Sequence, residues 1–202
     1  DTLTVDFATY NPLSLIVRDQ GLIEEALGDS VTVEWVQSAG SNKANEFLRA
    51  GSVDVGSTAG SAAHRARATG SPIQVIDIYS QPEWSAIVVP ADSPIPVSYT
   101  HLRAWAGLDP IMAAAEVESG ARLIYRNVDF NSYGFLNATE QFLTDHADLA
   151  QVVVDAYEQA RVWALEHPDE TAALLAEVSG IDPDVAATVI TERSNLDVSG
   201  IP

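Results

Sequence analysis

The first half of the chain alternates segments of strand periodicity with segments of helix periodicity, and this order constrains the fold more than any other feature. Apolar residues at alternate positions predict strands over 3–7, 31–36, 53–55, 73–79 and 86–89. Capping residues and helical spacing predict helices over 12–20, 43–50 and 62–68. Strands and helices in this order predict an α/β fold, in which helices cover both faces of a mainly parallel sheet.

Composition narrows the classes of partner. Of the 202 residues, 29 are acidic and 10 are basic, so the net charge is −19. Binding to nucleic acid and to anionic membrane surfaces depends on clustered Lys and Arg, whereas this chain has one lysine, Lys43, and no basic run. We therefore expect no nucleic acid and no anionic membrane surface as partner. The absence of cysteine excludes disulfides, thiolate metal sites and cysteine nucleophiles.

A strand, a Gly/Ser/Thr turn and a helix follow one another over 52–61. Val53 and Val55 supply the strand period, and Ser57 and Thr58 lie in the predicted turn. Backbone amides at the start of a helix, together with these hydroxyls, can bind sulfonate, phosphate or carboxylate without Lys or Arg. The alternative is an ordinary strand-to-helix turn in which Ser or Thr caps the helix.

Three further turns have a similar composition. Polar or aromatic residues follow the predicted strands at Tyr10-Asn11, 38–41 and 79–84, as they do at 56–58. Ligands of open parallel sheets bind beyond the carboxyl ends of the strands, where these turns would meet. Their convergence predicts a ligand-binding cleft at that edge of the sheet.

The last third of the chain is predicted to be helical. Apolar residues at helical spacing predict helices over 139–147, 148–167 and 168–180, and Pro183 starts a further short helix. Tyr157 and Trp163 belong to these apolar positions and are expected to pack in the core. The pattern weakens between 90 and 126.

Several segments resemble, in the same order along the chain, the substrate-binding proteins of ABC importers for aliphatic sulfonates, taurine and nitrate. They include Tyr10-Asn11-Pro12-Leu13, Val33-Glu34-Trp35, Gly40-Ser41-Asn42-Lys43, the run 47–60, Pro82-Glu83-Trp84, the run 104–110 and the run 131–137. The resemblance covers most of the chain. It implies a periplasmic-binding-protein-like fold of type II, in which two lobes with mainly parallel sheets close on a ligand.

The resemblance also implies a division of the chain and a set of site residues. Residues 1–87 and 134–202 would form the first lobe with the C-terminal helices, and 88–133 would form the remnant of a second lobe. The segments 86–90 and 133–138 would be the outgoing and returning crossing strands. The candidate ligand-binding residues carried over by position are Tyr10, Asn11, Ser41, Asn42, Ser57, Thr58, Trp84, Asp109, Asn131 and Tyr133.

The chain departs from the family pattern after residue 95. Roughly two βα units are missing, on the order of 60 residues, so the second lobe is predicted to be truncated. The segment 97–103 matches nothing in the family and resembles a foreign junction. The remaining strands and helix of the second lobe are too few to bury a core of their own.

The resemblance implies a solute-binding protein without catalytic residues, metal or cofactor. It would bind a small organic anion such as an aliphatic sulfonate or taurine between the lobes, and deliver it as a monomer to an ABC permease in the membrane. Such proteins are periplasmic or otherwise extracytoplasmic, with or without a lipid anchor, and the given chain contains no signal sequence. Asp109 could bind a ligand amine or cap the helix that follows Pro110.

Two alternatives stay open at this stage. Enzymes of the same fold include a pyrimidine synthase of thiamine biosynthesis, which the resemblance says relies on histidine and iron, and His64 follows the predicted anion-binding turn. A lone histidine there is also typical of a solvent-exposed position. The other alternative is a truncated fragment that folds but binds nothing.

Overall fold

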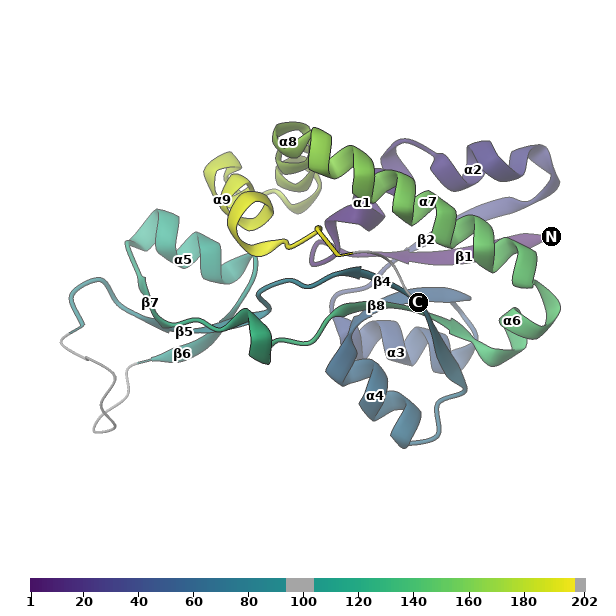
Figure 1. The fold of residues 1–202 in the computed structure, drawn as a ribbon, viewed down its shortest axis with the longest axis horizontal. Coiled ribbons are helices and arrows are strands. Elements are labelled where there is room, and N and C mark those ends of the chain that lie inside the picture. The colour runs from purple at the N-terminus through teal and green to yellow at the C-terminus, as the bar shows by residue number, and fades with distance from the viewer. Residues whose placement is uncertain (94–103, 199–202) are drawn as a thin grey trace.

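A computed structural model describes residues 1–93 and 104–198, and its strands form two sheets (Figure 1). The larger sheet has five strands, in the order β2 (Thr32–Gln37), β1 (Thr2–Phe7), β3 (Val55–Ala59), β8 (Gly134–Thr139) and β4 (Ile73–Ser80). The smaller sheet has three, in the order β6 (Trp105–Leu108), β5 (Ser85–Val89) and β7 (Arg122–Tyr125). The predicted foreign junction at 97–103 lies outside the described residues.

The five-stranded sheet is parallel except for one strand. β1 pairs in parallel with both β2 and β3, as the alternating pattern predicts. β8 runs antiparallel to both of its neighbours, β3 and β4, although it follows them by more than fifty residues. The three-stranded sheet is antiparallel throughout. The α/β prediction is therefore confirmed, and the parallel pairing is limited to the first strands of the larger sheet.

Gly134, the first residue of β8, shows how closely this strand approaches its neighbours. A Cβ atom at Gly134 would lie 2.5 Å from the Cζ atom of Tyr79 in β4. Side chains cannot approach at this distance, so glycine is the residue that allows β8 to start beside the Tyr79 ring. Leu136 and Ala138, further along β8, are fully buried in the main core.

Helices cover both faces of the larger sheet. In Figure 1, α1, α2 and α7 lie on one side of the sheet and α3 and α4 on the other. We call this sheet and its helices the five-stranded unit. The bounds are α1 (Pro12–Asp19), α2 (Leu22–Leu27), α3 (Ser41–Ala50), α4 (Gly60–Ala68), α6 (Glu140–Asp145), α7 (Ala147–Glu166), α8 (Pro168–Ser179) and α9 (Pro183–Thr188), with short 3-10 turns at 28–30 and 128–130 and a π-helical turn, η3 (Val189–Arg193).

The main core lies between the sheet and α1, α2 and α7. Leu3, Val5 and Tyr157 are among its buried members, and Trp163 packs against it while partly exposed. Tyr157 and Trp163 are thus core residues, as the helical spacing predicts. Apolar side chains removed from water contribute most of the stability of such a layer, at about 25 cal/mol per Å².

In the described residues, the smaller sheet has one helix of its own, α5 (Ile111–Ser119). We call the residues 85–93 and 104–125 the three-stranded unit. Its own core is small and consists of Ala86, Val88 and Met112, with flanking residues of β7. The next residue of α5, Ala113, belongs to a different cluster, formed with Leu175 and other residues of α8 and α9. The three-stranded unit therefore completes its burial against the C-terminal helices.

Two short segments connect the two units. Residues 81–84 lead from β4 to β5, and 126–133 lead from β7 back to β8. The segment 86–90, predicted as the outgoing crossing strand, instead belongs mostly to β5, since its apolar residues pack in the smaller sheet. The predicted lobe boundary at residue 87 falls inside β5.

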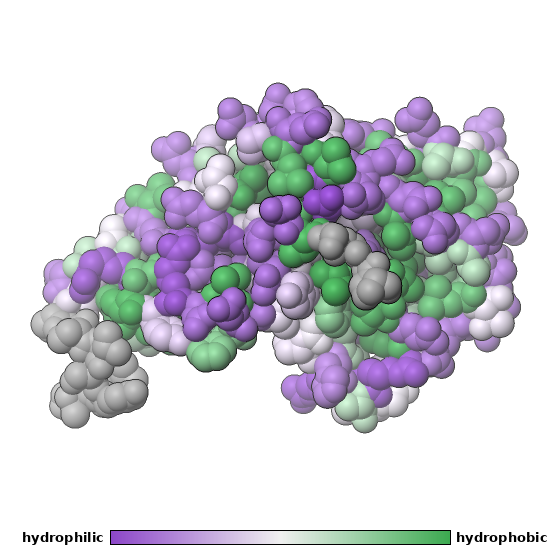
Figure 2. Space-filling view, in the orientation of Figure 1, coloured by the Kyte–Doolittle hydropathy of each residue, from purple (hydrophilic) through white to green (hydrophobic). Residues whose placement is uncertain are grey.

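The surface of the molecule combines hydrophilic and apolar regions. In Figure 2, hydrophilic residues cover much of the visible face, and apolar residues gather in groups on both units. None of the helices in the described ranges combines the length and apolar composition that a membrane span requires.

Candidate functional site

A cavity of about 670 Å³ opens between the two units. Its lining on the five-stranded unit comes from the turn after β1, the start of α3 and the start of α4. Its lining on the other side comes from β5, β6 and the returning connection. Six segments of the chain thus form one cavity at the predicted edge of the sheet. The lining residues are Tyr10, Ala39, Gly40, Ser41, Asn42, Lys43, Glu46, Ala59, Ser61, Trp84, Ser85, Leu108, Phe130, Asn131 and Ser132.

The starts of two helices line this cavity. α3 begins at Ser41 and α4 begins at Gly60, and within the described part of the chain neither helix has a side-chain hydrogen bond at its N-cap position. The first amide groups of a helix have no acceptor within the helix, and the helix dipole adds partial positive charge there. Two such ends at one cavity favour an anionic group.

Ser41 holds the two helix ends together. Its Oγ atom accepts a 2.9 Å hydrogen bond from the backbone amide of Ala59, the residue before α4. The start of α4 is also held next to β8, because the Gly60 amide donates a 2.8 Å hydrogen bond to the carbonyl of Tyr133, the residue before β8. A Cβ atom at Gly60 would lie 3.1 Å from the ring of Phe135, so a small residue is favoured here.

Two aromatic side chains form the wall beside the helix ends. Tyr10 and Trp84 have ring centroids 6.2 Å apart and planes tilted by 59°. The Tyr10 hydroxyl donates to the carbonyl of Ser57 at 2.8 Å, and Trp84 Nε1 donates to the carbonyl of Ser132 at 2.6 Å. Burial raises the pKa of Tyr10 well above its usual range, so its hydroxyl remains protonated. Both rings are therefore fixed in place and present apolar faces.

The opposite wall is more exposed. Phe130 is 81% exposed and Leu108 is 49% exposed, although both line the cavity. Asn131 joins this wall to β5, because its Oδ1 atom accepts a 3.1 Å hydrogen bond from the amide of Ser85. An apolar part of a ligand could contact this wall while a charged part lies at the helix ends.

One cation, Lys43, is among the lining residues. Its ammonium lies 2.9 Å from Oε2 of Glu46, and both side chains are at least half exposed. The hydrogen bond from Lys43 lowers the pKa of Glu46. Because its charge is already paired and solvated, Lys43 adds little to the field in the cavity. The helix ends are thus the main source of positive potential.

Three of the predicted site residues lie beneath the cavity and have protein partners. Asn11 is fully buried, caps α1 and donates to the hydroxyl of Tyr157 at 3.3 Å. Ser57 and Thr58 are also fully buried, and Thr58 Oγ1 accepts a 2.9 Å hydrogen bond from Asn137. The predicted turn at 56–58 is part of β3, which runs to Ala59 before α4 starts. The expected hydroxyl donors are therefore in the sheet, and Ser41 and Ser61 are the lining residues with hydroxyl groups at the starts of α3 and α4.

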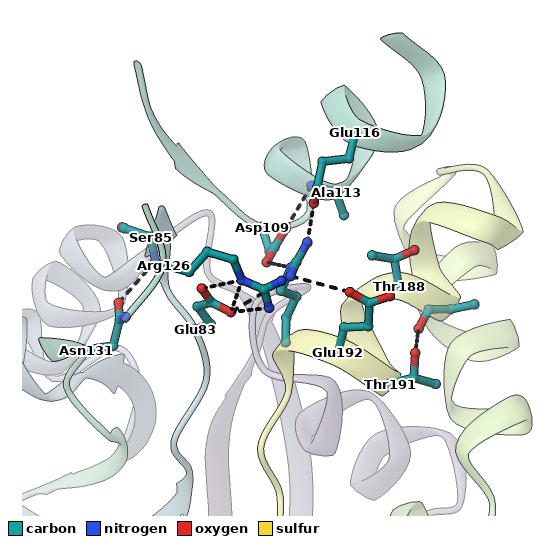
Figure 3. Close-up of polar contacts among 12 residues, drawn as sticks. Glu83, Ser85, Asp109, Ala113, Glu116, Arg126, Asn131, Thr188, Thr191 and Glu192 are labelled. Atoms are coloured by element: carbon teal, nitrogen blue, oxygen red, sulfur yellow. Dashed lines mark hydrogen bonds and ion pairs between the residues drawn. The ribbon is translucent and has the colours of Figure 1, made fainter. Parts of the chain in front are cut away.

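Tyr133 and Asp109 also lie away from the cavity lining. Tyr133 is 41% exposed and contributes its carbonyl to Gly60, as described above. Asp109 caps α5, since its Oδ1 atom accepts a 2.9 Å hydrogen bond from the amide of Ala113. Its second oxygen lies 3.8 Å from Nε of Arg193 (Figure 3). Of the two predicted roles of Asp109, the structure supports the helix cap.

A buried carboxyl that the sequence does not single out lies below the aromatic wall. Asp6 in β1 is fully buried, and its Oδ1 atom accepts a 2.8 Å hydrogen bond from the Ser57 amide. Burial raises the pKa of Asp6 from 3.8 to about 7, while hydrogen bonds from Ser38 and Ser57 act in the opposite direction. The one sequence signal for this buried carboxyl is an acidic residue within a strand in which apolar residues alternate.

His64, the candidate for an iron-dependent enzyme, lies outside this cavity. It is exposed on α4 and lines a separate groove with Arg67 and Val75. Within the described ranges, no three His, Asp or Glu side chains are arranged to hold a metal ion. The cavity and the histidine therefore do not form one site.

The comparisons with known proteins agree with this architecture. No family model matches the chain. A putative aliphatic sulfonates-binding protein of Bacillus subtilis is 26% identical over 96 residues, which are 46% of this chain and 29% of that protein. The matched part thus spans less than a third of the length of that relative.

Solved structures show the same fold over nearly the whole chain. The alkanesulfonate-binding protein SsuA of Xanthomonas axonopodis pv. citri, solved with MOPS bound, has a TM-score of 0.84 at 18% identity, and the match covers 95% of this chain and 84% of that chain. The periplasmic aliphatic sulphonate binding protein of Escherichia coli has a TM-score of 0.83 at 20% identity, covering 95% and 79%. The predicted periplasmic-binding-protein-like fold and the resemblance to sulfonate-binding proteins are confirmed.

Proposed function

We propose that this chain, which has the periplasmic-binding-protein fold, binds a small organic anion such as an aliphatic sulfonate or taurine in the cavity between its two units. The observation that supports this most directly is the meeting of the α3 and α4 starts at one cavity, with no unpaired cation among the described residues of its lining. Oxygen atoms of a sulfonate accept hydrogen bonds from such amides, and each bond to a charged group contributes roughly 1.5–3 kcal/mol.

The walls of the cavity suit the apolar part of such a ligand. Tyr10 and Trp84 present ring faces next to the helix ends, and Phe130 lies on the opposite side. An alkyl or aryl group between these rings would leave water while the sulfonate oxygens stay hydrogen bonded. Nitrate, which has no apolar part, would use the helix ends alone.

The residues proposed to contact the ligand are a subset of those predicted from the sequence. Tyr10, Ser41, Asn42, Trp84 and Asn131 line the cavity. Asn11, Ser57 and Thr58 would act indirectly, because they hold the elements that carry the contacts. Asp109 would stabilise the start of α5, and Tyr133 would hold the returning connection next to α4.

The proposed biological role is that of the solute-binding component of an ABC importer. The relatives with this fold include proteins named as periplasmic sulfonate-binding proteins, which supports an extracytoplasmic location and a non-catalytic role. The chain would act as a monomer and pass its ligand to a permease in the membrane. The five-stranded unit would form one lobe, and the three-stranded unit would be the remnant of the other.

A calorimetric ligand panel tests this function. We expect ethanesulfonate, butanesulfonate or taurine to bind the full chain, and the alkyl chain to increase affinity because it reaches the aromatic wall. Nitrate should bind more weakly. Pyrimidines serve as the contrasting class, since the enzyme alternative uses them. Binding of pyrimidines alone, with no response to any sulfonate, would contradict the proposal.

A further inference from the structure

A cluster of charged side chains lies where the two units meet the C-terminal segment (Figure 3). It contains four carboxylates and two arginines, and its members come from the connections between the sheets, from α5 and the turn before it, and from η3. They are Glu83, Asp109, Glu116, Arg126, Glu192 and Arg193.

Arg193 lies at the centre of this cluster, and its side chain is 2% exposed. It hydrogen bonds to Glu116 of α5. Its other contacts are longer ion pairs, at 3.8 Å to Asp109, 3.9 Å to Glu83 and 3.6 Å to Glu192. Among the described residues, its Nε and Nη1 atoms have no hydrogen-bond partner. A guanidinium buried to this degree depends on its surrounding carboxylates for compensation.

Glu83 joins the cluster to the connection between the sheets. Arg126, on the returning connection, contacts both oxygens of Glu83 at 2.7–3.1 Å. The backbone amide of Glu83 donates to the carbonyl of Arg193 at 2.9 Å. The next residue along the chain is Trp84, whose ring forms part of the cavity wall. Both the side chain and the backbone of Glu83 are therefore held in place, directly before a residue that lines the cavity.

The cluster and the cavity wall also meet in space. A small cavity of about 20 Å³ is lined by Tyr10, Trp84, Asp109 and Arg193, among others. Movement of the guanidinium would change the packing behind both aromatic rings. Burial, with smaller contributions from the neighbouring Glu116 and Glu83, raises the pKa of Asp109 to about 6, while the hydrogen bond from the Ala113 amide and the charge of Arg193 act in the opposite direction. The carboxylates are thus close enough to affect one another.

We propose that Arg193 is a positioning residue for the cavity: acting through Glu83, it holds Trp84 in the wall, and through Glu116 it holds the three-stranded unit against the C-terminal helices. The core of the three-stranded unit is small. The ion pairs and hydrogen bonds of the charge cluster therefore help to hold this unit against the C-terminal helices. The placement of Trp84 therefore depends on a residue 109 positions later in the chain, which does not line the main cavity.

The test uses the tryptophans of the full chain without any ligand. The chain has four, Trp35, Trp84, Trp105 and Trp163, and 5-fluorotryptophan labelling gives each a 19F resonance. The Trp84→Phe variant identifies the Trp84 signal. Trp163, stacked on His167 at 4.6 Å, and Trp35 report whether the five-stranded unit remains folded.

The variants are Arg193→Lys, Glu83→Gln and Glu116→Gln, with Glu192→Gln as the matched control. Glu192 also faces Arg193, but its side chain is 57% exposed and water can replace its ion pair. We expect the first three variants to shift or broaden the Trp84 resonance while the Trp35 and Trp163 signals keep their positions. Glu192→Gln should leave all four signals unchanged.

Two outcomes would overturn the inference. One is a Trp84 signal that stays in place in both Arg193→Lys and Glu83→Gln. The other is an equal displacement of all signals in Glu83→Gln, which would indicate a general loss of structure rather than positioning. Should Arg193→Lys fail to fold, Glu83→Gln and Glu116→Gln still decide the question. The readout needs no ligand, so its result is independent of the proposed function.

Discussion

The backbone amide of Ser57 donates a 2.8 Å hydrogen bond to the buried carboxyl of Asp6, and the carbonyl of the same Ser57 accepts the hydroxyl of Tyr10. A chain of two hydrogen bonds thus connects a buried acid in β1 to the aromatic wall of the cavity. This arrangement has consequences for stability and for ligand binding.

The first prediction concerns the pH dependence of folding. The pKa of Asp6 is raised by burial from 3.8 to about 7, so between these values the folded chain holds a proton that the unfolded chain releases. The contribution of Asp6 to the free energy of unfolding therefore decreases as the pH rises from about 4 to about 7, by at most about 4 kcal/mol. In Asp6→Asn this decrease should disappear, and the variant should be more stable than the wild type at pH 8.

Urea unfolding between pH 5 and pH 8 measures this effect. Asp155→Asn, on the exposed side of α7, is the control and should keep the wild-type slope. A wild-type slope in Asp6→Asn would show that Asp6 is ionised in the folded chain throughout this range.

The second prediction joins Asp6 to the proposed ligand. An anion at the helix ends disfavours a negative charge on Asp6 below, and the groups facing Asp6 that share its field, Tyr10, Tyr79 and Tyr157, are neutral. Binding of an alkanesulfonate should therefore be accompanied by proton uptake near pH 7, and affinity should fall as the pH rises above 7. Calorimetry in two buffers of different ionisation enthalpy measures the uptake. In Asp6→Asn the measured uptake should vanish.

The third prediction follows from the tight start of β8. In Gly134→Ala the new methyl group would lie 2.5 Å from the Tyr79 ring, which is itself fully buried and cannot move into solvent. Overpacking of this kind costs about 1–3 kcal/mol. We expect a lower thermal midpoint, by several degrees, in a calorimetric scan. Gly70→Ala is the contrasting variant: among the described residues nothing lies within 4 Å of its new Cβ, but its φ of +90° strains any side chain, whereas Gly134 has no positive φ, so a loss at Gly70 measures backbone strain and not overpacking.

Much of the larger sheet could be predicted from the sequence because its signals are local. The period of Leu3, Val5 and Phe7 predicts β1, and Asn11 before Pro12 predicts the start of α1, where the side chain of Asn11 accepts from the Ser14 amide. Alternation and capping depend on neighbouring residues, so they can be recognised without knowledge of the fold.

The positions of β5 and β8 could not be predicted in the same way. Both segments have strand periodicity, but the period does not indicate the partner of a strand or the sheet to which it belongs. β8 inserts between β3 and β4 because Gly134 permits close approach to Tyr79. Contacts between residues so distant in the sequence become apparent only in the folded chain.

The site shows the same limit. Ser57 and Thr58 have the composition of an anion-binding turn, and the structure places both in a buried strand. The N-terminal ends of α3 and α4 line the cavity instead, and the hydrogen bond between the Ala59 amide and Ser41 holds these two ends close together. Tyr10 and Trp84 both line the cavity. Tyr10 lies in the turn after β1, and Trp84 lies on the connection between the sheets.

The last prediction tests the role of Ser41. Its Oγ atom accepts from the Ala59 amide and lies at the cavity, so Ser41→Ala removes the link between the two helix ends and one polar group near the ligand. We expect a loss of about 1 kcal/mol, which is roughly a fivefold higher Kd for butanesulfonate. Ser52→Ala, at an exposed turn after α3, is the matched control and should bind as the wild type does. Lys43→Gln should also change Kd by less than about threefold, because Lys43 is already paired with Glu46. A larger effect at Lys43 than at Ser41 would show that a cation, and not the helix ends, holds the anion.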